Sequence, residues 1–122
     1  MSAYKILLVD DEEELVAAMV ERLEMRGIEV HGITNGSEAI RMIEETVYDA
    51  AILDIKMPGL DGHDVMKHIK KINPDMPVIL LTGHESVEEE EKTLVASSCS
   101  CLIKPVSIEK LLETLEACIK GC

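Results

Sequence analysis

The chain has 122 residues, the size of one domain, and its 24 acidic and 12 basic side chains give a formal net charge of −12. An acidic surface of this kind repels the phosphate backbone of nucleic acids, and a chain without Trp or Phe is poorly suited to bind ligands by aromatic stacking. Since no apolar segment has the length of a membrane span or the pattern of a signal peptide, we expect a cytoplasmic protein with reduced cysteines.

Short apolar runs alternate with helical patterns along the chain, without an intervening linker or repeat. The runs predict five strands, at residues 6–9, 28–33, 50–53, 78–81 and 101–103. Helical patterns follow at residues 12–26, 35–46 and 61–72, from residue 86 onward, and at 107–119. Five successive βα units predict a single domain of the α/β class.

Residues that favour helix ends stand at the predicted boundaries. Gly27 is placed to close the first helix in a left-handed conformation. Asp61 and Ser107 are predicted N-caps, and Ser86 with Glu89 forms a capping-box sequence before the fourth helix. The helix boundaries are therefore expected close to these residues.

The pattern of the strands predicts how the sheet is arranged. Strands joined through helices pair in parallel, and strands covered by helices on both faces are apolar throughout. Residues 28–33 instead alternate apolar and polar side chains, which places this strand at an edge of the sheet. A doubly wound sheet of order 2-1-3-4-5 satisfies this condition, and its ligand site lies beyond the carboxyl ends of the first and third strands.

Polar side chains follow four of the five predicted strands. They are Asp10 and Asp11 after the first, Asp54 after the third, Thr82 after the fourth, and Lys104 with Pro105 after the fifth. Taken singly, an acidic pair can cap a helix, and Asp54 or Thr82 can belong to a turn. Caps and turns have no reason to follow the first, third, fourth and fifth strands and to spare only the edge strand at 28–33, so we expect these residues to share one site.

The side chains expected at this site suit phosphoryl transfer. Two carboxylates about 4 Å apart repel by roughly 4 kcal/mol at an effective dielectric near 20, so the site needs positive charge. Lys104 supplies one charge, and oxygen ligands with open positions for water favour Mg²⁺ for the rest. Asp54 beside Mg²⁺, a lysine and the Thr82 hydroxyl is a candidate phosphoryl acceptor.

Four segments form an ordered set of motifs: LLVDDE at 7–12, LDIKMPGLDG at 53–62, LLTGH at 80–84 and KPV at 104–106. With these motifs the chain resembles, over nearly its whole length, the receiver domains of two-component response regulators. The resemblance implies a flavodoxin-like (βα)5 sandwich with a parallel sheet of order 2-1-3-4-5. It also implies that residues 1–122 are a single receiver domain, with the output domain absent, that serves phosphorelay signal transduction.

By this resemblance, Asp54 accepts a phosphoryl group from a sensor histidine kinase or a phosphotransfer protein. Asp11 binds Mg²⁺ together with Asp54 and the backbone carbonyl of Lys56. Asp10 assists in metal binding through water or hydrogen bonds.

The resemblance also gives roles to Thr82 and Lys104. Thr82 bonds the phosphoryl group and moves inward on activation, and Lys104, before a cis peptide bond to Pro105, pairs with that group. Phosphotransfer and autodephosphorylation are self-catalysed, so no separate enzyme activity is implied. The face formed by the fourth helix, the fifth strand and the fifth helix signals to a downstream effector or a fused output domain, or forms a homodimer on phosphorylation. No contact of this domain with nucleic acid or with a membrane is expected.

The chain departs from the family pattern before the fifth strand. Ser97-Ser98 stands where receivers usually have Gly-Ala, and Cys101 stands where they have an aromatic residue. We therefore expect signalling without the usual Thr–aromatic switch, through the loop after Thr82 and the start of the fourth helix. Lys56 and His84, each two residues beyond a site residue, are expected to set the lifetime of the phosphoryl group.

Two other functions fit part of the pattern. A phosphohydrolase of the haloacid dehalogenase type also phosphorylates an Asp after a strand, but it needs a second Asp where this chain has Lys56. A pseudo-receiver that acts only as an interaction module would have a damaged pocket, whereas this set of residues is complete. Four cysteines partly imitate metal-ligand spacing, and we interpret them as buried or half-buried thiols: Cys99, Cys101, Cys118 and Cys122.

Overall fold

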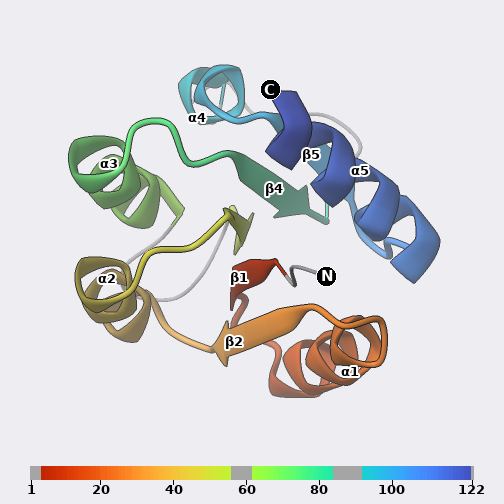
Figure 1. The fold of residues 1–122 in the computed structure, drawn as a ribbon. Helices are drawn as coiled ribbons and strands as arrows, with labels where there is room; N and C mark the ends of the chain where they lie inside the picture. The colour runs from red at the N-terminus through yellow and green to blue at the C-terminus, as the bar shows by residue number, and fades with distance from the viewer. Residues whose placement is uncertain (1–3, 56–61, 84–91, 122) are drawn as a thin grey trace.

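The computed structural model describes residues 4–55, 62–83 and 92–121, which form five successive βα units (Figure 1). The strands are β1 Lys5–Val9, β2 Glu29–Ile33, β3 Ala50–Asp54, β4 Val78–Thr82 and β5 Ser100–Ile103. The helices are α1 Glu13–Glu24, α2 Gly36–Glu45, α3 Gly62–Ile72, α4 Lys92–Ser97 and α5 Ile108–Gly121. None of the helices in the described segments is long and apolar enough to cross a bilayer.

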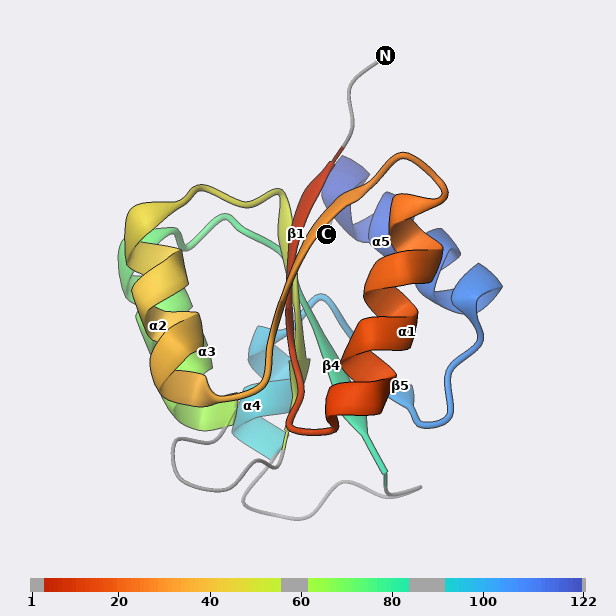
Figure 2. The same cartoon turned by 90° about the horizontal axis from the view of Figure 1, so that it is seen from below.

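The sheet is parallel throughout and has the order β2-β1-β3-β4-β5, which confirms the predicted order. Every residue of β3 and of β4 is buried, whereas β2, at the edge of the sheet, has one buried residue, Val30. Figure 2 shows the sheet from its edge, with α2, α3 and α4 on one face and α1 and α5 on the other.

Successive residues of each inner strand contribute to two apolar clusters, one on each face of the sheet. Leu7 of β1 packs in the cluster that contains Ile69 of α3. Leu8, its neighbour, packs in the cluster that contains Leu111 and Leu115 of α5. Because burial on both faces fixes the register of the strand, it also fixes the position of the polar residues that follow it.

The helix boundaries follow the local sequence where the structure describes them. Gly27 has φ +83°, so it takes the left-handed conformation predicted for the end of α1. Ser107 Oγ accepts a hydrogen bond from Lys110 N at 3.1 Å, which confirms Ser107 as the N-cap of α5. The caps predicted at residue 61 and at residues 86–89 lie outside the described segments.

Candidate functional site

The carboxyl ends of four strands carry the polar residues predicted there. Asp54 and Thr82 are the last residues of β3 and β4, so these strands are one residue longer than predicted, and Asp10 and Lys104 directly follow β1 and β5. The hydrogen bonds of the sheet extend to these positions: Asp10 N donates to Ile33 O at 3.1 Å, and Lys104 N donates to Thr82 O at 2.7 Å. The sheet therefore holds all four residues at one edge.

Three carboxylates meet at this edge. Asp10, Asp11 and Asp54 each offer an oxygen atom, and these atoms lie within 4.8 Å of one another. Asp10 is fully buried and Asp54 is 7% exposed, whereas Asp11 is open to solvent. Water screens the repulsion between buried carboxylates only weakly, so the cluster requires a cation close by.

Lys104 supplies a positive charge to the cluster. Its Nζ lies 2.8 Å from Asp10 Oδ2 and 3.4 Å from Asp54 Oδ2. Burial alone would lower the pKa of Lys104, but the hydrogen bond with Asp10 and the charges of Asp54 and Asp10 together raise the pKa above its ordinary value of 10.5. Lys104 is therefore protonated at neutral pH, and it offsets part of the carboxylate charge.

Glu12 is a member of the cluster that the sequence analysis did not identify. Its Oε1 lies 3.3 Å from Lys104 Nζ, although the two residues are 92 positions apart in the chain. Glu12 is also the residue before α1, where it makes no side-chain cap, and its N donates to Asp10 Oδ1 at 3.0 Å. Asp11 is therefore not the N-cap of α1. The available signal was that Glu12 directly follows the acidic pair.

The oxygen donors of this edge fit a divalent cation. Asp10 Oδ2 is buried, and its partner is the ammonium of Lys104 at 2.8 Å. Asp11 opens the cluster to solvent, so a bound cation could keep part of its water. Carboxylate oxygens together with water are the ligands that Mg²⁺ prefers. Lys56, whose carbonyl was expected to complete the set, lies outside the described residues, as does His84.

Thr82 occupies the place expected for it at the end of β4. It is 3% exposed, and its main chain is joined to Lys104 by the hydrogen bond given above. The peptide bond between Lys104 and Pro105 is cis, as the resemblance implies. The predicted roles of these residues in phosphoryl transfer remain predictions.

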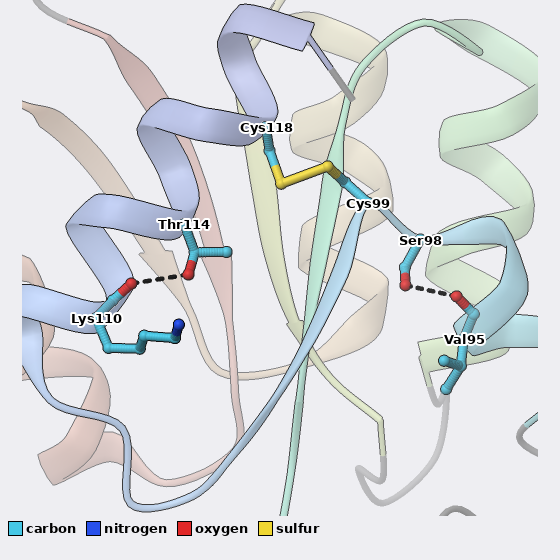
Figure 3. Close-up of a disulfide and its surroundings, with 6 residues drawn as sticks. All are labelled: Val95, Ser98, Cys99, Lys110, Thr114 and Cys118. Atoms are coloured by element: carbon cyan, nitrogen blue, oxygen red, sulfur yellow. Dashed lines mark hydrogen bonds between the residues drawn. A yellow bond between two sulfur atoms is a disulfide. The ribbon is translucent and has the colours of Figure 1, made fainter.

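The prediction of reduced cysteines is wrong for one pair. Cys99, just before β5, and Cys118, on the buried face of α5, form a disulfide (Figure 3). Their Cα atoms are 6.1 Å apart, a distance that a disulfide bridges without backbone movement. The pairing depends on the packing of α5 against the sheet, so the spacing of 19 residues in the sequence gave no signal for it.

Comparison with known proteins identifies relatives of the whole described fold. The family model described as response regulator receiver domain matches residues 6–116. The transcriptional regulatory protein PrrA of Mycobacterium leprae is 33% identical over 120 residues, which cover 98% of this chain and 52% of that protein. The chain therefore spans about half the length of this curated relative.

Two solved structures have closely similar folds. A CheY-like response regulator receiver domain protein from Methanospirillum hungatei matches with a TM-score of 0.89 and 30% identity, covering 98% of this chain and 95% of that one. Response regulator protein TrrA from Thermotoga maritima, solved in complex with Mg²⁺-BeF, matches with a TM-score of 0.82 and 30% identity. That match covers 94% of this chain and 98% of TrrA.

Proposed function

The chain belongs to the response regulator receiver family of phosphoacceptor signalling domains, and we propose that Asp54 is its phosphoacceptor. The observation that carries this proposal is the position of Asp54 Oδ2, which lies 3.4 Å from Lys104 Nζ within the carboxylate cluster. In the proposed reaction the P–N bond of a phosphohistidine breaks and a P–O bond to Asp54 forms. The phosphohistidine belongs to a sensor histidine kinase or to a phosphotransfer protein.

Asp54 suits the role of acceptor better than the other two aspartates. Both oxygens of Asp10 are engaged, one with Glu12 N and the other with Lys104 Nζ, and the residue is fully buried. Asp11 is exposed, so water molecules compete with a phosphoryl donor for contact with its carboxylate. Asp54 lies between these extremes: it keeps 7% exposure and contacts the lysine that would offset charge on the transferred group.

The other residues of the cluster support this acceptor. Lys104 holds a positive charge beside the Asp54 oxygen, and Thr82 ends the neighbouring strand, where its hydroxyl would bond a phosphoryl oxygen. Asp10, Asp11 and Asp54 would hold Mg²⁺, the ion found with TrrA. When bound, Mg²⁺ offsets negative charge on the phosphoryl oxygens.

Phosphorylation by a small donor tests the proposal directly. The chain is incubated with acetyl phosphate and Mg²⁺, and the modified residue is mapped by mass spectrometry. We expect one phosphoryl group on Asp54 and no labelling of Asp54→Asn or of wild type in EDTA. Asp75→Asn is the matched control, because Asp75 is exposed in the turn before β4. This turn lies at the amino ends of the strands, away from the carboxylate cluster. Labelling of another residue, or undiminished labelling of Asp54→Asn, would refute the assignment.

The same preparation separates this function from its two rivals. Continuous hydrolysis of a phosphomonoester would indicate a phosphohydrolase. Absence of any acyl phosphate with Mg²⁺ would indicate a pseudo-receiver. Faster decay of the phosphoryl group in the folded protein than in the urea-denatured protein, without added enzyme, would show that dephosphorylation is self-catalysed. Replacement of Lys56 or His84 by Ala is expected to change this decay rate and to leave phosphorylation intact.

We propose the partners of this domain from those of its family. Residues 1–122 would form one receiver unit in the cytoplasm, and the name of PrrA as a transcriptional regulatory protein suggests an effector or output domain that responds to it. The face made by α4, β5 and α5 would carry the signal, either to such an effector or to a second receiver in a homodimer. A receiver of this charge is not expected to contact nucleic acid itself.

A further inference from the structure

The disulfide between Cys99 and Cys118 joins two elements that are otherwise held together by packing. Cys99 lies just before β5, and Cys118 lies in the last turns of α5, on the face of the sheet that this helix covers (Figure 3). The polar side chains drawn beside it bond locally: Thr114 Oγ1 donates to Lys110 O within α5 at 2.8 Å, and Ser98 Oγ, just after α4, donates to Val95 O in that helix at 2.7 Å. Among the residues drawn, the disulfide is thus the connection between α5 and the segment that leads into β5.

The disulfide borders a hollow at the protein surface. The hollow has a volume of about 380 Å³ and is lined by Cys99, Cys118, Lys110, Glu113 and Ala117, among others. Cys99 is half-buried and Cys118 is 5% exposed. A small thiol or a dithiol protein can approach a disulfide in such a position, whereas one in the centre of the core would be protected.

The surroundings accept the two cysteines in the reduced state as well. A cysteine thiol behaves as a small apolar side chain, and both residues belong to the apolar cluster between α5 and the sheet. Leu111 and Leu115, which are 0% and 1% exposed, anchor α5 in that cluster independently of the disulfide. Reduction is therefore expected to release one restraint on α5 and to leave the fold intact.

The restraint acts on a functionally placed part of the chain. Residues 99–118 form a covalently closed loop in the oxidised state, and Lys104 lies within that loop. Lys104 contacts Asp10 and Asp54 at the acidic edge, and the segment after it leads directly into α5. Formation or reduction of this disulfide therefore changes the restraint on the segment that positions Lys104 in the candidate site.

We propose that Cys99 and Cys118 form a reversible thiol–disulfide pair that fixes α5 to β5 when oxidised. In the oxidising direction the two thiols react with a low-molecular-weight disulfide; an S–S bond forms between the cysteines, and two thiols leave with the two protons and two electrons. A dithiol reductant reverses the reaction. In the cytoplasmic location that belongs to the proposed function, disulfides are usually transient and redox-sensing. The domain would then respond to thiol redox state as well as to phosphorylation.

Equilibration with reduced and oxidised glutathione, followed by acid quenching and peptide mass spectrometry, tests the pairing. We expect one two-electron transition that joins Cys99 to Cys118 and reverses with dithiothreitol. Hydrogen exchange on the oxidised and the reduced wild type then tests the restraint. We expect several-fold faster exchange of residues 104–121 after reduction, unchanged exchange of α3, and a fall in Tm of about 5–15 °C.

Three variants keep the result interpretable. Cys99→Ser and Cys118→Ala are each expected to exchange like reduced wild type under both conditions, and Cys101→Ser is expected to respond like wild type. Pairing through Cys101 or Cys122, failure of the disulfide to form in excess oxidised glutathione, or equal exchange of residues 104–121 in verified oxidised and reduced protein would each overturn the proposal. None of these readouts depends on phosphorylation of Asp54, so the proposed function can fail separately.

Discussion

Replacement of Asp10 by Asn tests by how much the clustered carboxylates lower the free energy of unfolding. The side chain keeps its size but loses its charge. The charge of Asp10 attracts Lys104 Nζ at 2.8 Å by about 6 kcal/mol at an effective dielectric near 20. The Asp54 oxygen, within 4.8 Å, repels it by at least about 3.5 kcal/mol on the same scale. The net attraction lost in Asp10→Asn is therefore at most about 2.5 kcal/mol, because the Asp11 oxygen, which also lies within 4.8 Å, repels Asp10 as well.

The cost of burial opposes this remaining attraction. Asp10 is 0% exposed, and transfer of a carboxylate from water to such a place costs several kcal/mol, much more than transfer of a neutral amide. The carbonyl oxygen of Asn can still accept the hydrogen bond from Glu12 N that Asp10 Oδ1 accepts at 3.0 Å. Burial and repulsion together outweigh the ion pair, so without a divalent cation we expect Asp10→Asn to be more stable than wild type by about 1–3 kcal/mol.

Urea unfolding followed by circular dichroism measures this difference, first in EDTA and then in excess MgCl₂. Mg²⁺ is expected to stabilise wild type by mass action and Asp10→Asn much less, because the variant has lost a carboxylate of the cluster. Asp75→Asn, an exposed change far from the site, serves as the control and is expected to behave like wild type in both solutions. Lower stability of Asp10→Asn than of wild type in EDTA would refute the reasoning, since the ion pair with Lys104 would then outweigh repulsion and burial.

Two further predictions concern the packing of α1 and the charge of Lys104. Gly32→Ala would place a Cβ 2.6 Å from Val16 Cγ1 and 2.9 Å from Val20 Cγ2, so it is expected to lower the free energy of unfolding in urea by about 1–3 kcal/mol. Gly121→Ala meets open space and should change that energy by less than about 1 kcal/mol, and equal stabilities of the two variants would contradict the packing argument. Because the pKa of Lys104 is raised above 10.5, its stabilising charge is fully present below pH 10.5 and is lost as pH rises through the folded-state pKa. Unfolding at several pH values should therefore show wild type losing stability relative to Lys104→Arg only above pH 10.5, and a constant difference would contradict this.

The fold was predictable from the sequence because its signals are local. The alternating pattern of residues 28–33 predicted a strand at an edge of the sheet, and β2 is at an edge. The uniformly apolar residues 50–53 reflect a strand covered on both faces, and β3 is buried throughout. Parallel strands bring their carboxyl ends to one edge, so Asp10, Asp54 and Lys104 could be expected together before any contact was known.

Two contacts could not be predicted, because each joins distant parts of the chain through side-chain packing. The approach of Glu12 to Lys104 depends on how α1 begins, since Asp10 accepts the N–H of Glu12 and the side chain of Glu12 makes no cap there. The disulfide depends on how α5 packs against the sheet, which brings the Cα atoms of Cys99 and Cys118 to 6.1 Å. An apolar pattern specifies which face of α5 is buried, but it does not specify which residues of the strand lie beneath each turn.

Lys104 is the residue at which the proposed inputs meet. At its Nζ it is held by Asp10, Asp54 and Glu12, so addition of a phosphoryl group to Asp54 would change the charges that position it. Its backbone lies in the loop closed by the disulfide, so reduction would change how freely that backbone can follow. The side chain of Lys104 can follow a change of charge at Asp54 fully only when its backbone is free to move. The disulfide restricts that movement. We therefore expect any rearrangement of α5 on phosphorylation to be larger in the reduced protein than in the oxidised protein.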